Sequence, residues 1–83
     1  NVCKVYPNPS SDKVCFEFST KLDGSVTINL YNTSGSLIKT IKESDLNNEN
    51  IQINMDVKGL QKGVYYYQII TLGKTLNGKI SVL

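Results

Sequence analysis

Regular alternation of apolar and polar residues is the feature that most constrains how this chain folds. In K-V-C-F-E-F, residues 13–18, the side chains of Val14, Phe16 and Phe18 are separated by single residues such as Glu17. Successive side chains of a strand point to opposite faces, so a period of two residues is typical of a strand with one buried face. Similar segments, separated by Gly, Asn, Asp and Ser, predict strands at residues 2–6, 13–19, 25–31, 37–42, 50–55, 64–72 and 75–82.

Seven short strands within 83 residues predict an all-β fold, an immunoglobulin-like antiparallel β-sandwich of about seven strands, with a small open barrel as the alternative. Turn-forming residues are expected to connect the strands at residues 7–12, 22–24, 32–35, 45–49, 57–62 and 72–74. The core is expected to contain Val14, Phe16, Phe18, Val26, Ile28, Leu30, Ile51, Ile53 and Met55. A chain of this length supports one core, so residues 1–83 are expected to form a single domain.

The segment L-Q-K-G-V-Y-Y-Y-Q-I-I, residues 60–70, departs from the alternation. Tyr65 and Tyr67 fall on one face of the expected strand, while Val64, Tyr66 and Ile70 fall on the other. A strand that is apolar on both faces is either covered on its outer side or forms part of a contact surface.

The charge of the chain is small and dispersed. Nine lysines oppose seven acidic residues, which gives a formal charge of +2 without any run of like charges. Phosphate neutralisation requires a concentrated basic face, so this pattern argues against nucleic-acid binding. The hydrophobic content of 40% with 19% charged residues is that of a folded domain.

No apolar stretch approaches the ~18 residues that a membrane-spanning helix needs, and no signal-peptide pattern is present. The chain begins at Asn1 without methionine. We therefore expect a fragment or a processed piece, with any export signal upstream.

Catalysis and metal binding are not predicted. The chain has no histidine, which excludes Ser-His-Asp and Cys-His arrangements, and two cysteines cannot complete a four-ligand zinc site. Most of the carboxylates lie in or beside expected turns, where solvated residues are usual. Residues 45–49, D-L-N-N-E, supply oxygen ligands but lack the ligand spacing and glycine of a calcium loop. We expect no enzyme activity and no cofactor.

Cys3 and Cys15 form an even pair, which is compatible with one disulfide in an oxidising compartment. Alternation places Cys3 on the side of Val5 and Cys15 on the side of Lys13, so bonding depends on the register of the two strands. The alternative is two small thiols that are buried or half-buried.

Four short motifs occur in a characteristic order. They are V-Y-P-N-P at residues 5–9 followed by Asp12, L-Y-N-x-x-G at residues 30–35, L-x-x-G-V-Y at residues 60–65, and G-K at residues 73–74 with G-K-I at residues 78–80. In this order and spacing, the chain resembles the type A C-terminal sorting domain of proteins exported by the type IX secretion system (Por secretion system) of Bacteroidetes-type bacteria. The resemblance covers essentially the whole chain.

The resemblance implies a β-sandwich tail on a larger secreted protein that enters the periplasm by a separate N-terminal signal. Outer-membrane translocon components recognise such a tail, and a sortase-like peptidase typically removes it as the cargo is secreted or attached at the cell surface. The chain would then be a substrate of this machinery and have no catalytic role of its own.

The motif residues have expected structural roles, and the last two strands have an expected binding role. Tyr6, Pro7, Asn8, Pro9, Gly35, Leu60, Gly63 and Tyr65 are expected to shape strand ends and turns, with the Tyr65 hydroxyl bonded to backbone at a sandwich corner. The expected recognition surface consists of Val64, Tyr66, Ile70, Lys79, Ile80, Ser81, Val82 and Leu83, which would offer an apolar patch beside a strand edge.

Two other functions compete with secretion sorting. A carbohydrate- or surface-binding accessory module of a secreted enzyme would need exposed aromatic rings side by side, which Tyr31 and Tyr66 supply only if their strands are neighbours. A structural spacer between domains would need no functional surface at all.

Overall fold

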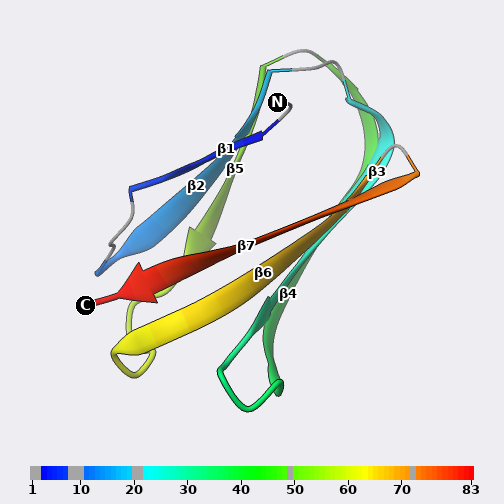
Figure 1. The fold of residues 1–83 in the computed structure, drawn as a ribbon. Coiled ribbons are helices and arrows are strands. Elements are labelled where there is room, and N and C mark those ends of the chain that lie inside the picture. The colour runs from blue at the N-terminus through cyan, green and yellow to red at the C-terminus, as the bar shows by residue number, and fades with distance from the viewer. Residues whose placement is uncertain (1–2, 8–10, 20–21, 49, 72) are drawn as a thin grey trace.

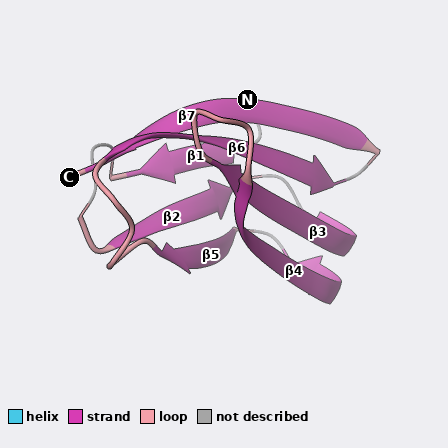
Figure 2. Ribbon diagram, turned by 90° about the horizontal axis from the view of Figure 1, so that it is seen from below, coloured by secondary structure: helices cyan, strands magenta, loops and turns pink. Residues whose placement is uncertain are grey.

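The computed structural model describes residues 3–7, 11–19, 22–48, 50–71 and 73–83. They form seven strands (Figure 1): β1 (Cys3–Tyr6), β2 (Lys13–Phe18), β3 (Leu22–Tyr31), β4 (Leu37–Asn48), β5 (Ile51–Asp56), β6 (Gly63–Thr71) and β7 (Lys74–Val82). Every regular element drawn for these residues in Figure 2 is a strand. The predicted all-β antiparallel sandwich is confirmed.

The strands form two antiparallel sheets. One sheet has three strands in the order β1-β2-β5, and the other has four in the order β4-β3-β6-β7. Among the described residues β7 pairs with β6 alone, so it is an edge strand of the larger sheet. The chain passes between the sheets after β2, after β4 and after β5, which places strands from both halves of the sequence in each sheet.

The core lies between the inner faces of the two sheets. Its fully buried side chains include Val14, Phe16, Phe18, Val26, Ile28, Leu30, Met55, Val57, Ile69 and Ile80. Ile53 is also buried and Ile51 packs against this cluster, so the predicted inner faces of β2, β3 and β5 are confirmed. Removal of these side chains from water is the main favourable contribution to folding.

Two expected turns are wrong, because the β3–β4 pair is longer than its sequence suggests. Residues 22–24 and 45–48 continue the ladder, with Leu22 opposite Asn48 and Gly24 opposite Leu46. The register shifts between Gly24 and Val26, and Gly24 has a φ of +103°. Glycine at positive φ commonly marks a β-bulge, so the turn-forming residue here bends a strand without ending it.

Two of the motif glycines do occupy turn conformations, as predicted. Gly35 has a φ of +84° in the loop between β3 and β4, where its N–H donates to the Asn32 carbonyl (3.0 Å). Gly63 has a φ of +144° at the start of β6. Residues with a side chain rarely adopt either backbone conformation, which explains why glycine occupies both positions.

Candidate functional site

The outward-facing residues of β3, β6 and β7 form one continuous surface, which we call the outer face of the four-stranded sheet. It comprises Thr27, Asn29 and Tyr31 on β3, Val64, Tyr66, Gln68 and Ile70 on β6, and Thr75, Asn77, Lys79 and Ser81 on β7. Val64, Tyr66 and Ile70 expose 38%, 46% and 42% of their surface, so the apolar outer side of β6 is not covered. Exposed apolar side chains grouped in this way are typical of a contact surface.

The last strand contributes less to this face than the sequence predicted. Ile80 and Val82 expose only 1% and 2% of their surface and belong to the core, so the expectation that they form part of the exposed patch is wrong. The alternation of β7 places Ile80 and Val82 on the inner face, each directly after an outward-facing residue, Lys79 or Ser81. Leu83, just after β7, is exposed.

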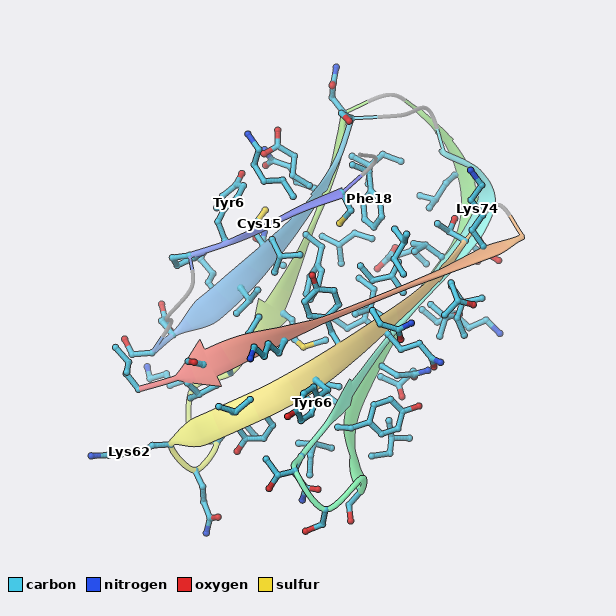
Figure 3. The ribbon with its side chains drawn as sticks, in the orientation of Figure 1. Tyr6, Cys15, Phe18, Lys62, Tyr66 and Lys74 are labelled. Atoms are coloured by element: carbon cyan, nitrogen blue, oxygen red, sulfur yellow. The ribbon has the colours of Figure 1, made fainter. Side chains whose placement is uncertain are left out.

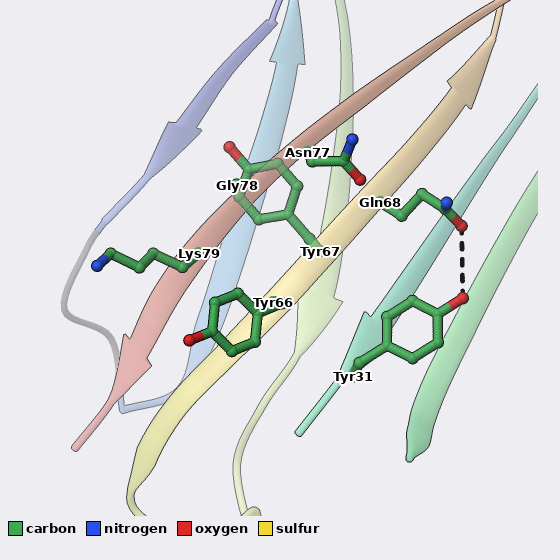
Figure 4. Close-up of a pocket in the computed structure, with 7 residues that line it drawn as sticks. All are labelled: Tyr31, Tyr66, Tyr67, Gln68, Asn77, Gly78 and Lys79. Atoms are coloured by element: carbon green, nitrogen blue, oxygen red, sulfur yellow. Dashed lines mark hydrogen bonds between the residues drawn. The ribbon is translucent and has the colours of Figure 1, made fainter. Parts of the chain in front are cut away.

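The two tyrosines of this face are adjacent. Tyr31 on β3 is the register partner of Tyr66 on β6, and Tyr66 is the partner of Lys79 on β7. Side chains paired across neighbouring antiparallel strands lie within contact range of one another. The three residues therefore form a row across the sheet, and Figure 4 shows the Tyr66 ring between Lys79 and Tyr31.

A depression of about 420 Å³ opens beside this row. Its lining consists of Tyr31, Tyr66, Tyr67, Gln68, Asn77, Gly78 and Lys79 (Figure 4). The Tyr31 hydroxyl donates a hydrogen bond to Gln68 Oε1 (3.4 Å), the contact dashed in the figure. Asn29 Nδ2 donates to the same oxygen (3.2 Å), which fixes the carboxamide at the rim of the depression.

Tyr67 connects this depression to the core. Its ring packs edge-on against Phe16, with centroids 5.4 Å apart and an interplanar angle of 83°. Burial, with a smaller contribution from the nearby Cys3 thiol, raises the pKa of the Tyr67 phenol. The ring also lies where a Cβ of its register partner Gly78 would be, so the glycine of the G-K-I motif allows Tyr67 to cross β7.

Tyr65 occupies the corner that the sequence predicted. Its ring is buried, and its hydroxyl donates a hydrogen bond to the Gln61 carbonyl (2.7 Å). The preceding Leu60 packs against the core and donates its N–H to the Val57 carbonyl (3.1 Å). Leu60 and Tyr65 of the L-x-x-G-V-Y motif therefore both stabilise the connection from β5 to β6.

The first motif ends a strand, as expected. β1 ends at Tyr6, and the Tyr6–Pro7 peptide bond that follows is cis. The Tyr6 hydroxyl donates to Glu17 Oε1 (2.7 Å). This hydrogen bond raises the pKa of the phenol, and the nearby Cys15 adds a smaller contribution in the same direction. The motif residues Asn8 and Pro9 lie outside the described residues.

The sequence profile of the secretion system C-terminal sorting domain family matches residues 4–83. The chain belongs to this family. The match extends over all seven strands apart from the first residue of β1, and it confirms the resemblance to type IX secretion sorting domains. The sorting domain is thus an export signal that acts with the secretion machinery and directs its protein to the medium or the cell surface. A search of curated proteins found no significant match.

The two thiols of the sorting domain are free, so the candidate disulfide is absent and the alternative of two separate thiols is observed. Cys3 is the register partner of Phe18 and faces the core, whereas Cys15 is the partner of Tyr6 on the outer side. Figure 3 shows Tyr6 beside Cys15, which accounts for the burial of an outward-facing cysteine. Burial, together with the nearby Cys15, raises the pKa of the Cys3 thiol from 9.0 to about 11.

Within the described part of the sorting domain, no three metal-ligating side chains gather and no helix is long and apolar enough to cross a membrane. The segment that resembled a weak calcium loop is strand as far as Asn48, and the side chains at positions 45 and 47–49 are not described. Its predicted form as a loop is therefore wrong up to that residue.

Proposed function

We propose that translocon components in the outer membrane recognise the outer face of the four-stranded sheet together with the β7 edge. In this proposal residues 1–83 are the C-terminal tail of a larger protein that has reached the periplasm. A sortase-like peptidase then removes the tail as the cargo is released or attached at the surface.

The observation that carries the proposal is the position of the uncovered apolar side chains next to an edge strand. Val64, Tyr66 and Ile70 lie on β6, next to β7, the edge strand of the described sheet. An edge strand offers unpaired backbone groups to an added strand, and neighbouring side chains supply specificity. Such recognition requires no catalytic residue.

The residues of the proposed surface divide into two groups. Val64, Tyr66 and Ile70 provide apolar contacts, with Lys79, Ser81 and Leu83 at the margin. Ile80 and Val82 act indirectly, because their burial anchors β7 to the core. A deletion of residues 79–83 would remove both anchors and test folding more than recognition, so exposed residues make better test positions.

The experiment is an export assay in a bacterium with type IX secretion. The chain is fused behind a fluorescent protein with an ordinary export signal, and fluorescence in the medium is measured. We expect the double variant Tyr66→Ala, Ile70→Ala to lower export at least about tenfold, because two central contacts of this kind are each worth more than about 1 kcal/mol. Mass spectrometry of the exported protein tests cleavage, with peptides from residues 1–83 expected to be missing.

The matched control is Leu37→Ala, Ile38→Ala. These side chains are also exposed and apolar, but they lie on β4 at the opposite edge of the same sheet. Export is expected to remain unchanged in this control. Unchanged export in a folded Tyr66→Ala, Ile70→Ala variant would exclude the proposed surface.

A further inference from the structure

We propose that the depression beside Tyr31 and Tyr66 binds a pyranose sugar of an oligosaccharide. The position of the two tyrosines is the first reason. They come from distant parts of the sequence, but the register of β3 and β6 pairs them directly. Tyr66 exposes 46% of its surface, and its ring borders an open volume of about 420 Å³, within the usual size range of small-molecule sites.

The polar groups around the ring are the second reason. Thr40 Oγ1 donates to Asn29 Oδ1 (2.9 Å), Asn29 Nδ2 donates to Gln68 Oε1 (3.2 Å), and the Tyr31 hydroxyl donates to the same oxygen (3.4 Å). This ladder crosses three strands and leads to Asn77, the β7 partner of Gln68. The contacts hold the Gln68 carboxamide in place before any ligand arrives, which lowers the entropy cost of binding.

The ladder also determines which groups face a ligand. In the described part of the chain, both hydrogen bonds to the Gln68 side chain end on Oε1, so the N–H donors of Nε2 remain for a ligand. Asn77 adds an exposed carboxamide beside the half-buried one of Gln68, and an amide both donates and accepts. Sugar hydroxyls likewise donate and accept, and the C–H face of a pyranose ring is apolar and can stack on tyrosine. Aromatic and amide groups are thus combined as a sugar requires.

The charge of the site is the third reason. The described residues that line the depression include one ammonium group, Lys79, and no carboxylate. This set repels neither a neutral nor an acidic sugar, and one lysine is too little charge for a nucleic-acid backbone. A peptide strand would pair with the β7 edge and not with the flat face, where the backbone groups of β6 are bonded on both sides.

The test is an NMR titration of the ¹⁵N-labelled chain with cellohexaose, maltohexaose, mannohexaose and hexagalacturonate, each up to about 10 mM, which detects affinities as weak as the millimolar range. We expect saturable shifts at Tyr31, Tyr66, Gln68 and Asn77 with at least one of these sugars. Binding of a neutral hexasaccharide or of the galacturonate alone would support the site and identify the neutral or acidic class.

Variants make the test specific. Tyr66→Ala and Gln68→Ala are each expected to weaken binding about tenfold, a loss of one ring or one bonded amide, while Tyr66→Phe keeps the ring and stays within about threefold. Tyr6→Ala is the matched control, because Tyr6 is an exposed tyrosine on the other sheet. The proposal is overturned if no sugar shifts these amides, or if Tyr66→Ala binds the sugar with unchanged affinity. The titration contains no secretion machinery, so its result is independent of the translocon proposal.

Discussion

The two sheets share one core but present different outer faces to solvent. On the three-stranded sheet, Lys4 lies opposite Glu17 and Lys13 lies opposite Asp56, so opposite charges are paired across the strands. On the four-stranded sheet, the corresponding side of β6 carries exposed Val64, Tyr66 and Ile70. Apart from Tyr6 and Cys15, the first face follows the apolar-in, polar-out rule of antiparallel sheets, whereas the second breaks it along β6, with Leu37 also exposed on β4.

The difference separates what folding requires from what recognition requires. Charged pairs on the three-stranded sheet keep that face solvated and contribute little to stability. Val64, Tyr66 and Ile70 keep 38%, 46% and 42% of their surface exposed, so packing within the chain accounts for only part of each side chain. The recognition proposed above gives the exposed part a role. The following predictions test this division, starting with the largest expected effect.

Phe16→Ala should unfold both sheets and thereby remove the difference between their outer faces. Phe16 is fully buried and its ring contacts Tyr67 from the opposite sheet. Loss of such a ring typically costs about 3–5 kcal/mol, a large part of the stability of a small domain. Urea denaturation followed by tyrosine fluorescence measures it. A loss below about 1 kcal/mol would contradict a core shared by the two sheets.

The reactivity of the Cys3 thiol tests how far the inner side of the three-stranded sheet is shielded from solvent. A thiol pKa of about 11 in place of 9.0 makes the thiolate of the folded chain roughly a hundredfold scarcer at pH 8. Alkylation of Cys3 by iodoacetamide, followed by mass spectrometry, should therefore be about that much slower than in urea. Equal rates in the two conditions would contradict this environment.

The same shift has a defined effect on stability. A folded-state pKa above the unfolded value means that the folded chain retains the thiol proton more strongly. The contribution is fully present below pH 9.0 and is lost as the pH rises toward about 11. Cys3→Ser, which does not titrate in this range, should flatten the pH dependence of the urea midpoint there.

Gly78→Ala tests the contact between β7 and the core. The new methyl group would overlap the Tyr67 ring, and overpacking of this kind costs about 1–3 kcal/mol. In a Tyr67→Leu background the added cost should shrink, because the obstructing ring is gone. Urea denaturation of the four proteins in this double-mutant cycle measures the coupling. Equal costs in the two backgrounds would mean that Tyr67 is not the reason for the glycine.

Tyr65→Phe should cost about 1 kcal/mol, because it removes the hydrogen bond from a buried hydroxyl to the Gln61 carbonyl. Tyr6→Phe removes an equally short hydrogen bond, to Glu17, but on a solvent-exposed side chain. Its effect on the urea midpoint should be the smaller of the two. The reverse order would show that the corner is not a stabilising feature of the sandwich.

The smallest expected effect is the most informative one for the comparison. Tyr66→Ser and Ile70→Thr should each change the free energy of unfolding by no more than about 0.5 kcal/mol, as is usual for exposed positions. The same urea series measures them. A loss above about 2 kcal/mol in either variant would mean that the outer face serves folding and would remove the argument for recognition.

Local pattern was sufficient to predict most of the fold. The alternation around Phe16 correctly separated the inner and outer faces, and the motif before Tyr65 predicted its corner. The extended β3–β4 pair was missed because Gly24 serves as a bulge, and turn-forming residues do not reveal whether the chain turns or only bends.

The candidate site was predicted in part. Exposure of Tyr66 and Ile70 follows from a strand that is apolar on both faces. The same alternation, applied to β7, would have placed Ile80 and Val82 in the core, so that error was avoidable. The pairing of Tyr31 with Tyr66 was not predictable, because register between strands distant in sequence depends on the packing of the whole sandwich.

The passage of the chain back and forth between sheets has a kinetic consequence. The row of Tyr31, Tyr66 and Lys79 spans β3, β6 and β7, and between β3 and β6 in the sequence lies β5, which belongs to the other sheet. Sandwiches that depend on such distant pairings fold in milliseconds to seconds, late compared with local structure. A receptor that binds this row would therefore not bind nascent or misfolded chains. Recognition of the export signal would then be restricted to chains that have finished folding.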